Sequence, residues 1–162
     1  MRIERVVINA SPIICLCKSG LSEILPTLFT DIIVPAAVHK EITAKEDIAH
    51  ACAQFFAHQH VKIESDIVIP SSVISWDLGE GESAVLSHAL KHSEYWAVID
   101  DREARKCATT LGCHCTGTVG IILLAKRRGI ITSAKDCLTK LQNAGLYLSQ
   151  DFIREICLKA GE

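Results

Sequence analysis

Oxygen-bearing side chains stand where predicted strands end and in the helices that follow them. One polar residue ends the buried run 5–8, two carboxylates end the run 96–99, and two glutamates lie in predicted helices. The residues are Asn9, Glu41, Glu82, Asp100 and Asp101. Carboxylates gathered at one sheet edge repel each other, and Mg²⁺ or Mn²⁺ removes that cost because both prefer oxygen ligands. Such an ion can activate water and neutralise a phosphodiester, so the set predicts metal-dependent phosphodiester chemistry.

Each of these residues also has an ordinary structural interpretation. Asp101 directly before a helix is typical of an N-cap, and Glu82 in a first turn complements the helix dipole. Glu41 fits a solvated helix surface, and Asn9 fits a residue that only turns the chain. Spacing alone does not decide between these interpretations and a metal site.

The elements that must position these residues alternate between strand and helix. Strands are expected at 5–8, 32–34, 61–64, 96–99 and 114–116, with 61–64 at a sheet edge. Helices are expected at 12–19 (Ser11 as N-cap), 22–29, 35–42, 46–58, from about 80, 102–111, 118–128, 133–144 and 149–160. The stretch 65–77 is expected to be a loop. This alternation predicts an α/β sandwich with a central, mainly parallel sheet.

Composition is that of a single folded domain with an aliphatic core. The chain has 162 residues, of which 49% are hydrophobic and 5% aromatic. Its formal net charge is −2, so contact with a nucleic acid would require a local basic patch. No signal peptide or run of transmembrane length is evident, which predicts a cytoplasmic protein without membrane contact.

The eight cysteines leave two minor alternatives open. Their even number allows disulfides, and the cluster Cys113-His114-Cys115 allows zinc. Most of the cysteines fall at apolar positions of helical patterns, so we expect small buried side chains rather than either of these.

Five segments, in a fixed order, carry a family resemblance. They are VVINASPIICLCKSG, IIVPAAVHKEI, LGEGESAVLSHAL, AVIDDREARKCATTLGCHCTGTVGIILLAKRRGII and LTKLQNAGLYLSQDFIREICLKAGE. With these segments the chain resembles PIN-domain nucleases, in particular a toxin-like subgroup of bacterial toxin–antitoxin systems. The resemblance implies one three-layer α/β/α domain over residues 1–162, with helices in 133–162 packed on it. It also implies a ribonuclease that uses Mg²⁺ or Mn²⁺ to cleave single-stranded RNA.

The resemblance assigns roles to individual residues. The metal-binding positions fall at Asn9, Glu41, Glu82 and Asp101, with Asp100 beside the last, and an assisting hydroxyl falls at Ser11. The first position is an aspartate in active members, whereas Asn9 offers a carbonyl oxygen without charge. Asp100 and Glu80 are spare carboxylates that would compensate in part.

RNA contacts and partners complete the prediction. Candidate cations are Arg102, Arg105, Lys106, Lys126, Arg127 and Arg128, which fit solvated helix faces equally well. The resemblance implies a cognate antitoxin and a homodimer. Three hypotheses follow: a toxin-type endoribonuclease, a degenerate module that binds RNA or a protein without cleavage, and a domain for a small phosphorylated ligand. The lack of a Gly-rich phosphate loop opposes the third.

Overall fold

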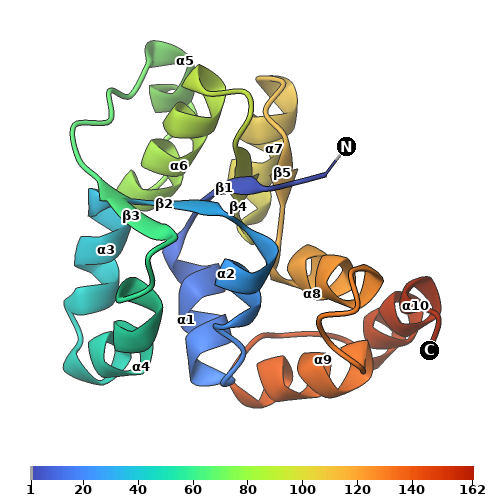
Figure 1. Ribbon diagram of the computed structural model, residues 1–162. Coiled ribbons are helices and arrows are strands. Elements are labelled where there is room, and N and C mark those ends of the chain that lie inside the picture. Colours follow the sequence, from blue (N-terminus) through green and yellow to red (C-terminus); the bar gives the residue numbers. More distant parts are fainter. Residues whose placement is uncertain (1) are drawn as a thin grey trace.

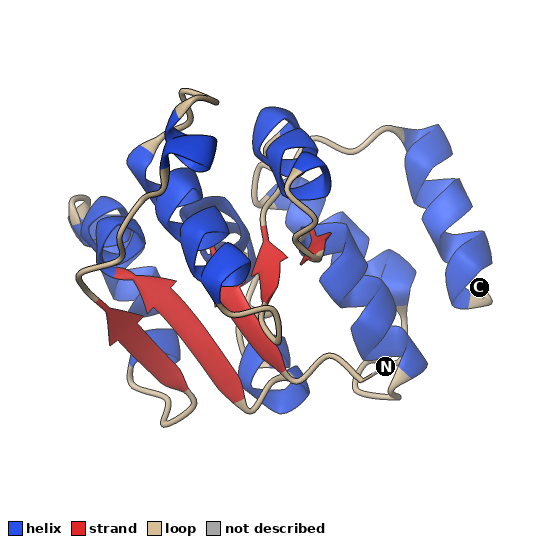
Figure 2. Cartoon of the chain, turned by 90° about the horizontal axis from the view of Figure 1, so that it is seen from above, coloured by secondary structure: helices blue, strands red, loops and turns tan. Residues whose placement is uncertain are grey.

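Five parallel strands form the centre of the protein. The computed structural model describes residues 2–162. The strands are β1 (Arg5–Ile8), β2 (Asp31–Pro35), β3 (Val61–Glu64), β4 (Trp96–Val98) and β5 (Cys115–Thr116). Their order is β3-β2-β1-β4-β5, and Figure 2 shows their arrows pointing in one direction. The prediction of a parallel sheet with 61–64 at its edge is confirmed.

The strand order has one consequence for function. From β1 the chain continues to β2 on one side, whereas β4 pairs with β1 on the other side. The carboxyl ends of β1 and β4 therefore flank the point where the winding reverses. Ligands of open α/β sheets bind in the crevice at such a point.

Ten helices cover the sheet within the described residues. They are α1 (Ala10–Lys18), α2 (Ile24–Leu28), α3 (Ala36–Thr43), α4 (Glu46–Phe56), α5 (Ser71–Ile74), α6 (Glu80–Lys91), α7 (Arg102–Thr110), α8 (Thr118–Arg127), α9 (Ala134–Asn143) and α10 (Gln150–Ala160). Figure 1 shows α5, α6 and α7 over one face and α1, α2 and α4 under the other. The fold is an α/β sandwich, as predicted.

The core is aliphatic because the central strands are covered on both faces. Val6, Val7 and Ile8 of β1 are fully buried. Side chains of α9 and α10, such as Leu138 and Ile153, belong to the same continuous core. The C-terminal helices are thus packed on the sheet domain, next to α8 (Figure 1).

Two local predictions are wrong, the N-cap of α1 and the absence of a helix in 65–77, because the sequence pattern was ambiguous at both places. Ser11 is not the N-cap, because α1 begins at Ala10 with the extended Asn9 before it. Pro12 lies in the first turn, where a missing N–H costs nothing, so it does not mark the start. Residues 71–74 form α5, which is too short to show a periodicity.

The cysteines behave as small core side chains. Across residues 2–162 every cysteine is a free thiol, and four of them are buried. Cys113 and Cys115 are half-buried, and no cluster with His114 capable of holding a metal occurs in the described chain. None of the described helices is long and apolar enough to cross a membrane.

The Glu162 carboxylate joins the end of α10 to the beginning of α9. It accepts hydrogen bonds from the Ala134 N–H at 2.7 Å and the Lys135 N–H at 3.1 Å. It also lies 2.8 Å from Lys126 Nζ on α8. These donors lower the pKa of Glu162 from its usual 4.5 to about 2, with the Lys126 bond as the largest cause. The ionised carboxylate therefore connects three helices.

Glu162→Gln should lower the melting temperature at pH 7 by about 2 °C, because the ion pair is lost. A carboxyl whose pKa falls on folding stabilises the fold above pH 4.5 and loses that contribution as the pH approaches 2. Differential scanning fluorimetry should therefore show that the melting temperatures of wild type and Glu162→Gln approach each other as the pH falls from 7 to 3. Glu155→Gln, which breaks an exposed pair within α10, is the control. A pH-independent difference would contradict the assignment.

Candidate functional site

Asn9 lies at the carboxyl end of β1, directly before α1. Its backbone N–H donates to the Val98 carbonyl of β4 at 3.0 Å, which fixes it at the crevice between the two strands. The residue is 3% exposed, and its Nδ2 donates to Glu82 Oε1 at 3.1 Å. Its Oδ1 is buried and has no hydrogen-bond partner within residues 2–162. An unpaired buried carbonyl oxygen is uncommon, and its lone pairs are available to an ion or a water.

Glu41 on α3 and Glu82 on α6 both lie next to Asn9. A Cβ built on Gly81 would lie 3.0 Å from Asn9 Oδ1 and 3.4 Å from Glu41 Oε2. The two oxygens thus face the same small space above a helical glycine, and Glu82 follows directly on α6. The structure therefore brings together three of the predicted residues: Asn9, Glu41 and Glu82.

Gly81→Ala should favour α6 yet weaken any binding of a cation at this space. Alanine stabilises a helix interior by about 1 kcal/mol relative to glycine. The added methyl would also lie 3.3 Å from Val38 Cγ2, so it has to displace its neighbours. We expect an unchanged or higher melting temperature and an affinity for Mn²⁺ reduced about tenfold, measured by calorimetry. Equal Mn²⁺ affinity of wild type and Gly81→Ala would contradict binding of a cation in the space between Asn9 and Glu41.

Asp100 is held at the end of β4 by the first residue of α8. The Thr118 N–H donates to Asp100 Oδ1 at 2.8 Å, and Thr118 Oγ1 donates to Oδ2 at 2.6 Å. Gly117 allows this approach, because a Cβ there would lie 2.7 Å from Asp100 Oδ1 and 2.9 Å from Arg105 Nη1. A fully buried threonine thus orients a carboxylate beside an arginine. Thr118 was not among the predicted site residues.

Asp101 has a different environment. It is exposed, and its Oδ1 accepts a hydrogen bond from the Ala104 N–H at 2.8 Å, as the N-cap of α7. No hydrogen bond or ion pair in the described structure joins its carboxylate to Asn9, Glu41 or Glu82. Asp101 is therefore the N-cap of α7, as one of its two interpretations predicted, and its role as a metal ligand stays a prediction.

Asp101→Ala should lower the free energy of unfolding by about 1 kcal/mol, because the cap is lost. Asp101→Asn should keep the cap and the stability, since an amide oxygen accepts the same bond. Calorimetry with Mn²⁺ then separates the two roles of Asp101. If Asp101 is a metal ligand, the stable Asp101→Asn protein should bind Mn²⁺ about tenfold more weakly than wild type. Unchanged Mn²⁺ affinity would leave Asp101 with the cap alone.

The predicted basic residues fall into two groups. Arg102, Arg105 and Lys106 line an open hollow of about 650 Å³ with Trp76 and Asp100. This hollow adjoins the end of β4 and supplies positive charge beside the acidic side chains.

The second group of cations lies elsewhere. The Arg128 guanidinium donates to the carbonyls of Leu28 at 3.0 Å and Ile3 at 2.8 Å, which precede β2 and β1. Lys126 pairs with Glu162. Since α8 begins beside Asp100 and is about 15 Å long, its end lies at the opposite sheet edge. Lys126, Arg127 and Arg128 therefore lie away from the surface around Asp100, and their contact with RNA stays a prediction.

Ser11 and Cys15 lie on α1 below the site. Ser11 is exposed in the first turn of α1. Burial raises the pKa of the Cys15 thiol, and the negative charge of Asp100 raises it further. Cys15 therefore lies near Asp100 as a neutral thiol. Nothing in the sequence pattern distinguished it from the other cysteines.

Comparison with protein families agrees with this geometry. The family model DUF3368, described as a PIN domain, matches residues 5–162. The chain belongs to this PIN-domain family. No curated protein is significantly similar to it. The match supports a nuclease-like fold in general and covers all the strands and helices of this PIN domain.

The family assignment gives the acidic residues a context. PIN domains generally use divalent metal ions. In the described part of this PIN domain, no three His, Cys, Asp or Glu side chains are grouped closely enough to form a metal site. The closest grouping contains an amide, because Asn9 stands between the two glutamates.

Proposed function

We propose that this PIN domain is a metal-dependent endoribonuclease of the toxin type, which hydrolyses phosphodiester bonds of single-stranded RNA. The observation that carries the proposal is the unpaired Asn9 Oδ1, which faces the same space as Glu41 Oε2. A divalent cation would satisfy both oxygens at the point where the sheet winding reverses.

The donor set fits Mg²⁺ or Mn²⁺. Mg²⁺ commonly uses one or two carboxylates and completes its shell with waters and substrate phosphate oxygens. Asn9, Glu41 and Glu82 provide two carboxylates and one amide oxygen, with Asp100 as a further carboxylate nearby. When bound, the ion would supply Lewis-acid chemistry, lowering the pKa of a water and neutralising phosphate charge.

The other residues position these groups and the substrate. Asn9 Nδ2 orients Glu82, and Thr118 orients Asp100. Arg105, Arg102 and Lys106 line a hollow with Asp100, and we propose that they neutralise a phosphate next to the cleaved bond. Such contacts give salt-dependent binding with little sequence preference.

One observation favours a second candidate, a PIN module that binds RNA or a protein without cleavage. The Asn9 amide already occupies Glu82 Oε1, an oxygen that a cation would otherwise use. Because Asn9 adds no charge, the site holds one negative charge fewer than a carboxylate would give it.

The remaining proposals concern location and partners. We propose a cytoplasmic protein that forms a homodimer and is held by a cognate antitoxin. These proposals rest on the resemblance to toxin-like PIN domains.

The test is cleavage of an unstructured, fluorescently labelled RNA by the purified chain with Mg²⁺, with Mn²⁺ or with EDTA. We expect cleavage with either metal and none with EDTA. Binding without cleavage at any metal concentration would favour the second candidate. Neither binding nor cleavage would contradict both.

A further inference from the structure

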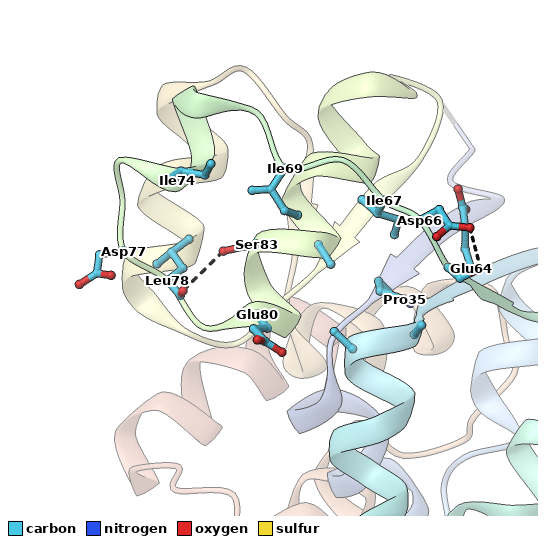
Figure 3. Close-up of a pocket in the computed structure, with 14 residues that line it drawn as sticks. Pro35, Glu64, Asp66, Ile67, Ile69, Ile74, Asp77, Leu78, Glu80 and Ser83 are labelled. Carbon is cyan, nitrogen blue, oxygen red and sulfur yellow. Dashed lines mark hydrogen bonds between the residues drawn. The ribbon is translucent and has the colours of Figure 1, made fainter.

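A groove beside α6 is unused by the proposed chemistry. It has a volume of about 540 Å³, within the range of ligand-binding clefts. Its walls are the start of α3, the segment 64–69 after β3, the helix α5 and the start of α6. Figure 3 shows Ile67, Ile69, Ile74 and Leu78 around the hollow. The surface between them is therefore apolar.

The ends of the groove are acidic. Asp77 and Glu80 lie at one end, and Glu64 and Asp66 lie at the other (Figure 3). Among the described residues, no lysine, arginine or histidine lines the groove. His88 lies 3.1 Å from Glu64, but burial lowers its pKa, so at pH 7 it is neutral and leaves the carboxylate charge uncompensated.

One wall is an irregular segment that turns at Asp66, whose φ is 61°. β3 is the edge strand of the sheet, and residues 65–69 continue from it without secondary structure. Across the described chain, no backbone hydrogen bond involves any of these five residues. An exposed backbone next to an edge strand can pair with an added extended peptide, whose alternate side chains enter neighbouring pockets.

We propose that this groove binds an extended segment of a protein partner in which apolar side chains alternate with lysine or arginine. The apolar side chains would fill the space among Ile67, Ile69 and Ile74. The cationic side chains would pair with the carboxylates at both ends. The proposal goes beyond the nuclease proposal and does not depend on cleavage, because it concerns a separate surface.

The acidic charge of the groove favours a basic peptide over two other occupants, RNA and a second copy of the chain. RNA phosphates would meet four carboxylates and, within the described lining, no cation. A second copy of the chain, paired about a twofold axis through the groove, would bring like-charged rims together. A basic, amphipathic peptide is the occupant that both the apolar wall and the acidic ends favour.

The test uses three fluorescein-labelled nonapeptides and anisotropy at physiological salt. The first alternates Lys and Leu, the second has Glu in place of Lys, and the third has Ser in place of Leu. We expect the first to bind in the micromolar range and the other two to bind at least about tenfold more weakly. Equal binding of the Lys–Ser peptide would mean unspecific charge attraction and would overturn the proposal.

Two variants locate the binding. Asp66 and Asp77 have φ of 61° and 51°, a region that asparagine tolerates, so Asp66→Asn with Asp77→Asn removes charge without backbone strain. Ile74→Ser removes an apolar side chain that is 62% exposed and carries little stability. Each protein should bind the Lys–Leu peptide about tenfold more weakly than wild type.

The matched control is Glu46→Gln with Asp47→Asn on α4, which removes the same charge from another exposed surface. It should bind the peptide as wild type does. Unchanged binding in the groove variants would overturn the proposal. So would sedimentation of the free chain as a dimer that Ile74→Ser dissociates, because a second copy would then cover the groove.

Discussion

Asn9→Asp is expected to lower the free energy of unfolding without metal by about 2 kcal/mol, and to raise the affinity for Mn²⁺ about tenfold or more. In the wild type, the Asn9 amide donates to Glu82 at 3.1 Å. An aspartate would place a buried carboxylate at this distance from the half-buried Glu82, so one of the two carboxyl pKa values must rise. A divalent cation bound between the two carboxylates attracts both of them and so offsets their repulsion.

Thermal unfolding with and without Mn²⁺ measures this effect, and RNA cleavage is measured on the same preparations. The loss of stability should disappear in Mn²⁺ and also below about pH 4, where the carboxyl is protonated. Asn143→Asp at the exposed C-terminal end of α9 adds the same charge. It should lose less than about 1 kcal/mol through the helix dipole, and Mn²⁺ should not restore that loss. If Asn9→Asp is as stable as wild type and indifferent to Mn²⁺, the space above Gly81 does not hold a cation.

Glu82→Gln and Glu41→Gln are expected to reduce RNA cleavage about a hundredfold each, in wild type or in the Asn9→Asp background. The amide oxygen introduced by Glu82→Gln would still accept the Asn9 hydrogen bond, so the fold of this variant should be unchanged. Glu41 is exposed, and its replacement removes charge from the site without opening the core.

Circular dichroism and calorimetry with Mn²⁺ accompany the cleavage assay. Both variants should fold as wild type and bind Mn²⁺ more weakly. Glu46→Gln, on the first turn of α4, is the control and should cleave at the wild-type rate. A Glu82→Gln protein with full activity would remove Glu82 from the mechanism.

The sequence was sufficient for the elements with strong local signals. β1 and its neighbours were predicted because buried parallel strands contain uninterrupted β-branched runs. The cap Asp101 was predicted because its side chain bonds within one turn, a purely local interaction, and Ser133 and Ser149 cap α9 and α10 in the same way. The four-residue α5 lacked such a signal and fell within a predicted loop.

The arrangement of the site could not be predicted from local patterns alone. Strand order decides that Asn9 and Asp100 flank one crevice, and no periodicity encodes that order. The contact of Asp100 with Thr118 joins residues 18 positions apart, so no local pattern indicated that Thr118 holds Asp100. The hydrogen bonds of Arg128 to Leu28 and Ile3 are also long-range, so no local pattern indicated them either.

The most direct test of the nuclease proposal is metal-dependent cleavage by wild type compared with Glu82→Gln, both purified identically and assayed on one single-stranded RNA with Mn²⁺. We predict that wild type cleaves the RNA, that EDTA abolishes cleavage, and that Glu82→Gln retains about one hundredth of the rate. Equal rates in the two proteins, or no cleavage by wild type and by Asn9→Asp, would contradict the proposal.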